Sequence, residues 1–267
     1  VWMSVITAKD KNEGDNDSNS RGKVFVVGIG PGHINHLTAS ARNAIAGSSV
    51  IVGYKRYVNL IMPLVTHQRL CVSGMTEELA RCKQAIDLAK AGAIVSLVSS
   101  GDPGIYGMAG LVLELNEKHH VDVEIVPGVS AVNAAASLVG APLMNDFAVI
   151  SLSDLLTPWE VIEKRIRCTA EGDFVIAIYN PKSKKRIEHI VRAKEIIRRY
   201  RSGNTPVAIV TNAFREGESI VTTDLENLTS ENIGMLSIVI IGNSQTVCLG
   251  GKLITSRGYQ TKYADSF

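Results

Sequence analysis

The sequence has few of the residues that build metal centres, disulfide frameworks or nucleophilic sites. Its four cysteines are scattered, and none forms a CxxC pair or a Cys/His spacing of the kind that binds zinc. We therefore expect free thiols and no metal site. No G-x-S-x-G and no Gly-Lys-Ser/Thr sequence is present, which excludes a nucleophile elbow and a P-loop. The cysteines are Cys71, Cys82, Cys168 and Cys248.

An excess of charge of one sign and long apolar runs are also missing. The chain has 28 basic and 26 acidic residues, and its net charge of +2 predicts no binding to nucleic acid. No apolar run is long enough to span a bilayer, so no membrane partner is expected. The opening segment, Val1–Ile6, is too short for a signal peptide and acidic polar sequence follows it, so we expect a cytoplasmic location.

What is present is an ordinary globular composition with a repeated order of strand, turn and helix. The 267 residues are 45% hydrophobic and 20% charged, which is enough apolar material for two domains. Residues 1–22 lack apolar residues after Ala8 and are expected to be a disordered extension. We predict an N-terminal α/β domain over residues 23–141 and a C-terminal α/β domain with a mixed sheet over residues 142–267. The predicted active-site cleft lies between them.

A glycine-rich turn near the middle of the first domain is the strongest local signal for a ligand. Ile94–Val98 is apolar and β-branched, which predicts a buried strand, and Pro103 ends it. Gly101, Gly104 and Gly107 let the backbone approach a ligand closely. The turn places Asp102 at the carboxyl end of the strand, where ligands bind in open α/β sheets.

The first glycine-rich turn, Gly28-Ile-Gly-Pro-Gly32, resembles a dinucleotide fingerprint but does not match it. His33 stands where the third glycine is required, and Pro31 removes a backbone donor that a pyrophosphate would use. No acidic residue ends the next predicted strand, Ser49–Val52. We therefore do not expect a nucleotide to bind here in the dinucleotide manner.

Two further segments leave alternatives open. In Pro127-Gly-Val-Ser-Ala131, Ser130 either caps the following helix or stands next to amides that contact a ligand. A basic cluster at the predicted start of a later helix either forms a solvated face or meets the carboxylates of an acidic ligand. This cluster consists of Lys182, Lys184, Lys185 and Arg186.

Taken together, Gly28–Gly32, Ser100-Gly-Asp-Pro-Gly104 and Pro127–Ala131 resemble the tetrapyrrole methylase family. Four more stretches resemble the branch of that family that methylates position 17 of precorrin-3B in cobalamin biosynthesis. They are Gly53-Tyr-Lys-Arg-Tyr57, Ile150–Trp159, Tyr179-Asn-Pro-Lys-Ser183 and Ile240–Ser244. The resemblance covers the chain from about residue 23 to its end.

The resemblance implies that S-adenosylmethionine binds in the cleft and that the chain forms a homodimer. Methyl transfer from a sulfonium to carbon needs the reactants held in line and water excluded, which suits a site with few titratable side chains. By similarity, the residues that contact the cofactor are Pro31, Gly101, Asp102, Ile105, Ser130, Ala131, Asn180 and Ala208.

The implied substrate is a polycarboxylate tetrapyrrole, which gains a methyl group at its seventeenth carbon while the ring contracts. Ring contraction requires proton movement, and the candidate acids and bases are Asp102, Tyr54, Lys55 and His33. Two other interpretations remain open. The chain is then either a methylase of the same fold acting at another position or on another substrate, or a carrier that binds a tetrapyrrole without turnover.

Overall fold

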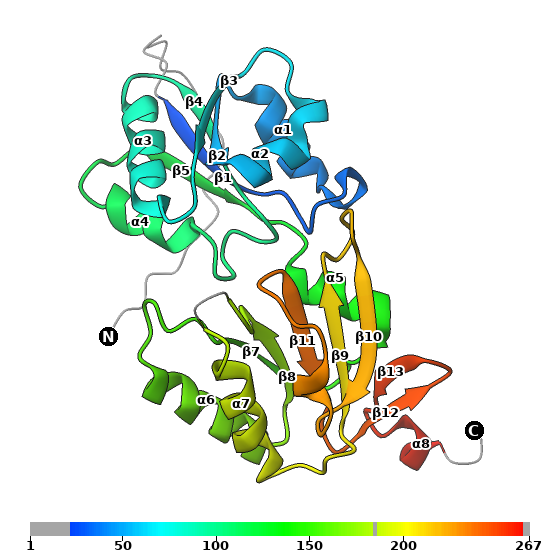
Figure 1. Ribbon diagram of the computed structural model, residues 1–267. Coiled ribbons are helices and arrows are strands. Elements are labelled where there is room, and N and C mark those ends of the chain that lie inside the picture. Colours follow the sequence, from blue (N-terminus) through cyan, green and yellow to red (C-terminus); the bar gives the residue numbers. More distant parts are fainter. Residues whose placement is uncertain (1–21, 184–185, 264–267) are drawn as a thin grey trace.

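The protein contains two five-stranded sheets, one for each half of the chain (Figure 1). The structure is a computed structural model, and it describes residues 22–183 and 186–263. The expected disordered extension, apart from Gly22, and the basic residues Lys184 and Lys185 lie outside these ranges. Within the described ranges, no helix has the length and apolar character needed to cross a membrane.

The first sheet is wholly parallel, in the order β3-β2-β4-β1-β5. Its three central strands are rich in valine and isoleucine and mostly buried, as expected of a parallel sheet covered by crossover helices, whereas the edge strands β3 and β5 are largely exposed or half-buried. Helices α3 (Glu78–Lys90) and α4 (Ala109–Asn116) pack on one face, and α1 (Ala39–Gly47) and α2 (Lys55–Ile61) on the other. The strands are β1 (Lys23–Gly28), β2 (Val50–Tyr54), β3 (Arg69–Ser73), β4 (Ile94–Ser99) and β5 (Asp122–Val126).

The second sheet is mixed, as predicted, in the order β10-β9-β11-β8-β7. Only its β7–β8 pair is parallel. Helices α6 (Trp159–Glu171) and α7 (His189–Arg198) cover one face through a large aliphatic cluster. The strands are β7 (Phe147–Ser151), β8 (Val175–Tyr179), β9 (Pro206–Thr211), β10 (Ser219–Asp224) and β11 (Ser237–Ile241).

Helix α5 (Ala131–Val139) covers the other face of the second sheet, although it directly follows the first sheet in the chain. Its Ala135 and Val139 share a buried cluster with Ala208 of β9 and Ile240 of β11. The division expected at residue 141 assigns this helix to the N-terminal domain. We propose instead that the division lies between β5 and α5, because a helix belongs with the sheet whose core it completes.

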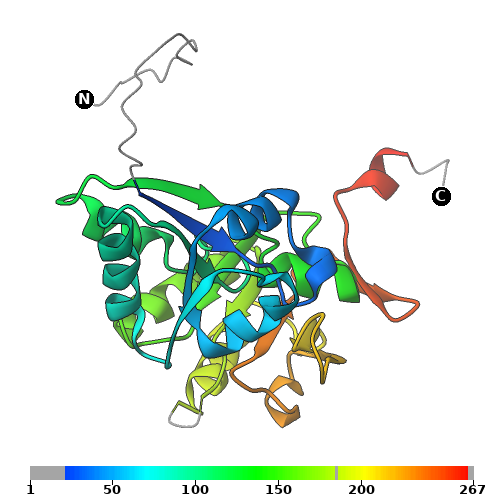
Figure 2. The same cartoon turned by 90° about the horizontal axis from the view of Figure 1, so that it is seen from above.

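A small third sheet joins the end of α5 to the last part of the described chain. The two-residue strand β6 (Gly140–Ala141) pairs in parallel with β13 (Lys252–Thr255), which pairs with β12 (Thr246–Leu249). The short helix α8 (Tyr259–Lys262) follows. In Figure 2, β13 and α8, drawn in red, project away from the two large sheets.

Several elements differ from the sequence-based expectation. Helix α2 and strands β3, β12 and β13 were not predicted, because each is short and lacks a clear apolar period. Helix α7 begins at His189 rather than near Lys185. Threonine is a common N-cap residue, and Thr76 with the acidic residues after it predicts a helix start; the structure begins α3 at Glu78, and Thr76 has a positive φ of 67°, outside the helical region.

Candidate active site

A cavity of about 1010 Å³ lies between the carboxyl ends of the first sheet's strands and the second sheet. Its volume reaches the upper end of the usual range for ligand pockets, so it has room for more than one small molecule. Residues from the turns after β1, β2 and β4 form one wall, and residues from β8, β9, β11 and their connections form the other. The position agrees with the rule that ligands bind at the carboxyl ends of parallel strands.

Three glycine-bearing turns meet at the base of the first wall. Gly30 and Gly101 form an isolated antiparallel bridge, with N–H to carbonyl distances of 3.1 and 2.8 Å. A Cβ on Gly128 would lie 2.2 Å from the carbonyl oxygen of Gly101, and a Cβ on Gly28 would lie 2.6 Å from the nitrogen of Gly128. Close packing of one backbone against another therefore requires these glycines, in addition to any approach of a ligand.

The carboxylate of Asp102 ties two of these turns together. One oxygen accepts a hydrogen bond from the Gly104 N–H at 2.8 Å, and the other accepts from the Gly128 N–H at 3.0 Å. Each carboxylate oxygen has a second lone pair, so Asp102 retains acceptor capacity toward the cavity that it lines. No ion pair among the described residues includes Asp102.

The structure brings six of the eight predicted cofactor residues to the cavity wall. Ser130 is buried and caps α5, accepting a hydrogen bond from the Asn133 N–H. Ala208 is fully buried beneath α5, in the core of the second sheet. Neither lines the cavity. The six that do are Pro31, Gly101, Asp102, Ile105, Ala131 and Asn180.

The predicted acid–base residues are divided between three places. Asp102 and Tyr54 line the main cavity. Lys55 lines a shallower neighbouring pocket of about 720 Å³, which shares Tyr54 with the main cavity. His33 is exposed and lines neither pocket, and its Nδ1 accepts a hydrogen bond from the Asn35 N–H. It thus caps a single 3-10 turn, Ile34–His36.

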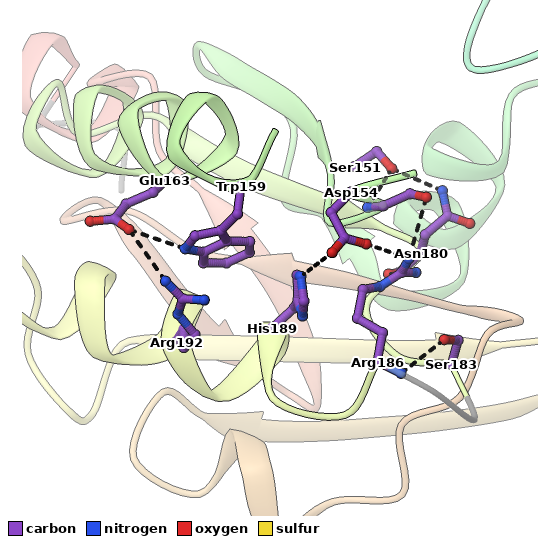
Figure 3. Close-up of polar contacts among 10 residues, drawn as sticks. Ser151, Asp154, Trp159, Glu163, Asn180, Ser183, Arg186, His189 and Arg192 are labelled. Carbon is purple, nitrogen blue, oxygen red and sulfur yellow. Dashed lines mark hydrogen bonds and ion pairs between the residues drawn. The ribbon is translucent and has the colours of Figure 1, made fainter. Parts of the chain in front are cut away.

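On the opposite wall, a polar network holds the segment that carries Asn180 (Figure 3). The Asn180 side chain donates to Ser151 Oγ at 2.9 Å, and Arg186 donates to the Asn180 carbonyl at 3.0 Å. Arg186 also faces Asp154 at 3.6 Å, which in turn pairs with His189. Arg186 is therefore a structural link, which differs from both interpretations of the basic cluster. Of that cluster, Lys182 lines the cavity.

The residues that connect the two walls were not predicted from the sequence. Arg215, in the connection between β9 and β10, donates to the Pro31 carbonyl and, at 2.6 Å, to Ser100 Oγ. Tyr106 and Tyr179 line the cavity with ring centroids 5.3 Å apart, and the Val132 N–H donates to the Tyr179 hydroxyl at 2.9 Å. No local pattern marks these residues, because each acts through a partner far away in the sequence.

Three residues with an uncommon backbone conformation line the same cavity. Tyr106, Asn180 and Asn212 all line the cavity, and each has a positive φ between 50° and 53°. Non-glycine residues adopt this conformation infrequently, and such residues cluster at ligand sites. Burial also raises the pKa values of Tyr57, Tyr106 and Tyr179 above their usual value, which itself lies well above pH 7, so these hydroxyls keep their protons.

Comparison with known proteins identifies the family. Residues 23–229, most of the chain, match the family described as Tetrapyrrole (Corrin/Porphyrin) Methylases. The chain belongs to this family. The tetrapyrrole methylase fold is also that of the crystal structure of the methyltransferase CobJ, which aligns with a TM-score of 0.84 and 37% identity. That alignment covers 88% of this chain and all of the CobJ chain.

Two curated relatives are close to this methylase in sequence. It is 49% identical to the probable cobalt-factor III C(17)-methyltransferase of Salmonella typhimurium, over 88% of this chain and 98% of that protein. It is 50% identical to the cobalt-factor III methyltransferase of Priestia megaterium, over 91% of this chain. That alignment spans only 46% of the Priestia protein, so the chain matches about half of that longer relative.

Proposed function

We propose that the chain transfers a methyl group from S-adenosylmethionine to C17 of a polycarboxylate tetrapyrrole of the precorrin-3B or cobalt-factor III type, with contraction of the ring. The observation that carries the proposal is the 49% identity, over nearly the whole length of both proteins, to a relative named for C17 methylation. The cavity between the two sheets supports it, because its size suits a donor and a macrocycle together.

The residues of the cavity suit S-adenosylmethionine. This cofactor, when bound, supplies a methyl group on a positively charged sulfonium. Asp102 offers a carboxylate that has no cationic partner among the described residues, which favours a positively charged ligand. We expect the backbone around Gly101, the side chain of Ile105 and Ala131 to hold the cofactor, with Asn180 on the opposite wall.

The remaining work of the protein is orientation, exclusion of water and movement of protons. Two rigid walls hold two ligands at a fixed separation, which replaces a bimolecular encounter by a local one. Aliphatic side chains from the second sheet, including Val210 and Ile238, exclude water from part of the cavity. We propose that Tyr54 and Lys55, which meet at the border of the two pockets, orient the ring or move protons during contraction.

We extend the proposal to location and assembly. The resemblance to the family favours a homodimer, and the scattered cysteines favour a location in the cytoplasm. Light scattering on the purified chain tests the homodimer, because a monomeric mass at micromolar concentration contradicts it.

Turnover with a labelled methyl donor and a panel of tetrapyrroles tests the proposed function. We expect a mass gain of one methyl group together with a shift in the visible spectrum, since loss of a meso carbon shortens the conjugated path. A methylated but uncontracted product contradicts the ring-contracting branch and leaves the family intact. Binding without methyl transfer to any tetrapyrrole supports the carrier alternative.

A further inference from the structure

Two arginines face the main cavity without an acidic partner. Arg215 enters it from the second half of the chain, and Arg56 enters it from α2 in the first half. Among the described residues, no ion pair includes either side chain. With Lys182, three cationic side chains line the cavity against the single carboxylate of Asp102. The net positive charge of the cavity lining therefore favours an anionic ligand.

The guanidinium of Arg215 is held rigidly but is not saturated. Its Nε donates to the Pro31 carbonyl, and its Nη2 donates to Ser100 Oγ at 2.6 Å. A guanidinium carries five N–H donors, so Nη1 and part of Nη2 remain for a ligand. The side chain passes over Gly32, where an added Cβ would lie 2.6 Å from its Cγ and Nε. This close passage fixes the position of the charge.

The two arginines line the same cavity, and their like charges act on one another. Burial lowers the pKa of Arg215, the nearby Tyr57 hydroxyl opposes that shift, and the charge of Arg56 lowers the pKa further. An anion that pairs with both guanidinium groups offsets this repulsion, and the neutral Tyr57 hydroxyl, which also lines the cavity, is a further hydrogen-bond donor.

We propose that Arg215 and Arg56 together bind one peripheral carboxylate of the macrocycle, and that Arg215 determines specificity for carboxylated rings. The inference rests on the proposed function and adds the residues that recognise its substrate. Because Arg215 is bonded to the turns after β1 and β4, a carboxylate held there has a fixed position relative to Asp102 and Gly101. The same contact thus orients the ring against the wall proposed to hold the methyl donor.

The alternative hypothesis is that Arg215 has a purely structural role, since its hydrogen bonds to Pro31 and Ser100 already join the two halves of the chain. The two roles differ in their response to salt. Loss of an ion pair with the ligand reduces the salt dependence of ligand binding, whereas loss of an internal link lowers stability without changing that dependence. Binding must therefore be measured at several salt concentrations, beside thermal unfolding.

The experiment measures binding of uroporphyrin, an octacarboxylate porphyrin, to the full chain through quenching of the porphyrin fluorescence. We compare the unmodified chain with Arg215→Met and Arg56→Met, which keep the length of the side chain but remove the charge. Arg199→Met is the matched control, because Arg199 is exposed at the end of α7, does not line the cavity, and its loss changes the net charge equally. Calorimetry with S-adenosylmethionine runs in parallel.

We expect Arg215→Met to weaken porphyrin binding by roughly ten- to a hundredfold, with a shallower salt dependence, while donor affinity changes less than twofold. Arg56→Met, at an exposed position, has a smaller effect in the same direction, and Arg199→Met matches the unmodified chain. Unchanged porphyrin affinity or an unchanged salt slope in a folded Arg215→Met chain overturns the inference alone. Failure of the unmodified chain to bind the porphyrin overturns both the inference and the proposed substrate class.

Discussion

The backbone N–H of Ser151 donates a hydrogen bond to the hydroxyl of Tyr106 at 3.0 Å, which joins the turn after β4 to the outer edge of β7. The same hydroxyl donates to the carbonyl of Val149, also at 3.0 Å. A phenol thus satisfies two neighbouring backbone groups that the edge strand β7 leaves unpaired. The first half of the chain is fastened to the second at this point.

Replacing Tyr106 by phenylalanine removes the hydroxyl and keeps the ring, so this variant tests the two hydrogen bonds separately from the ring contacts. We expect Tyr106→Phe to lower the free energy of unfolding by about 0.5–1.5 kcal/mol, because the hydrogen bonds are lost while the ring contact with Tyr179 remains. Amide hydrogen exchange at Ser151 should accelerate. Tyr200→Phe, at an exposed tyrosine, is the control. Equal exchange at Ser151 in both variants contradicts the role of the hydroxyl.

The carboxylate of Asp102 provides a second test, because both of its oxygens accept backbone hydrogen bonds. In Asp102→Asn one acceptor becomes an NH2 group that faces an N–H donor, so we expect a loss of about 1–2 kcal/mol in stability. Chemical denaturation measures it. The control is Asp122→Asn, at an exposed acid paired with Lys23, where a change within about 0.5 kcal/mol is expected. Equal losses of stability in the two variants contradict the structural role of the Asp102 carboxylate.

Two glycines differ sharply in the space around them. A Cβ on Gly128 would lie 2.2 Å from the Gly101 carbonyl oxygen, so Gly128→Ala should destabilise the fold by about 2–3 kcal/mol. A Cβ on Gly110, inside α4, would meet no atom within 4 Å, so Gly110→Ala should stabilise by about 0.5–1 kcal/mol. Thermal unfolding compares them, and a shift of the same sign in both contradicts the packing argument.

A pH-dependent loss of stability is expected in the alkaline range. Burial raises the pKa of the Cys82 thiol from 9.0 to about 11, so the folded state keeps a proton that the unfolded chain releases. The associated stability is present below pH 9 and is lost as the pH rises from 9 to 11, by about 2–3 kcal/mol. Denaturation across this range should show a shallower decline for Cys82→Ala than for the unmodified chain. Parallel declines contradict the assignment to Cys82.

Turnover should depend on the residues at the border of the two pockets. We expect Tyr54→Phe and Lys55→Ala to slow ring methylation at least tenfold while donor affinity changes little, if their groups move protons or orient the ring. Single-turnover kinetics with calorimetry on the same samples separates the two effects. An equal loss of rate and of donor affinity places these residues in donor binding instead.

The sequence predicted those parts of the fold and site that have local causes. The strand and glycine turn at Ile94–Gly107 were found because β-branched residues, Pro103 and glycines leave a local pattern. Six of the eight residues assigned to the cofactor by resemblance line the cavity, and three of them, Gly101, Asp102 and Ile105, belong to this turn. The link from Arg215 to Pro31 spans 184 positions, and no period or turn signal encodes a contact of that range. Helix α5 was predicted as a helix, but its partner sheet was not, because its alanines fit either sheet.

The placement of α5 also sets an order of events during synthesis. The ribosome completes this helix at Val139, yet β11, which it covers, ends only at Ile241. Synthesis proceeds at about 5–20 residues per second, so several seconds pass before the strands that cover the apolar side of α5 have been synthesised. The five strands of the parallel sheet all precede α5 in the chain, so they are synthesised before that interval begins. We therefore expect the nascent chain to expose the apolar side of α5 until translation reaches the last strand of the second sheet.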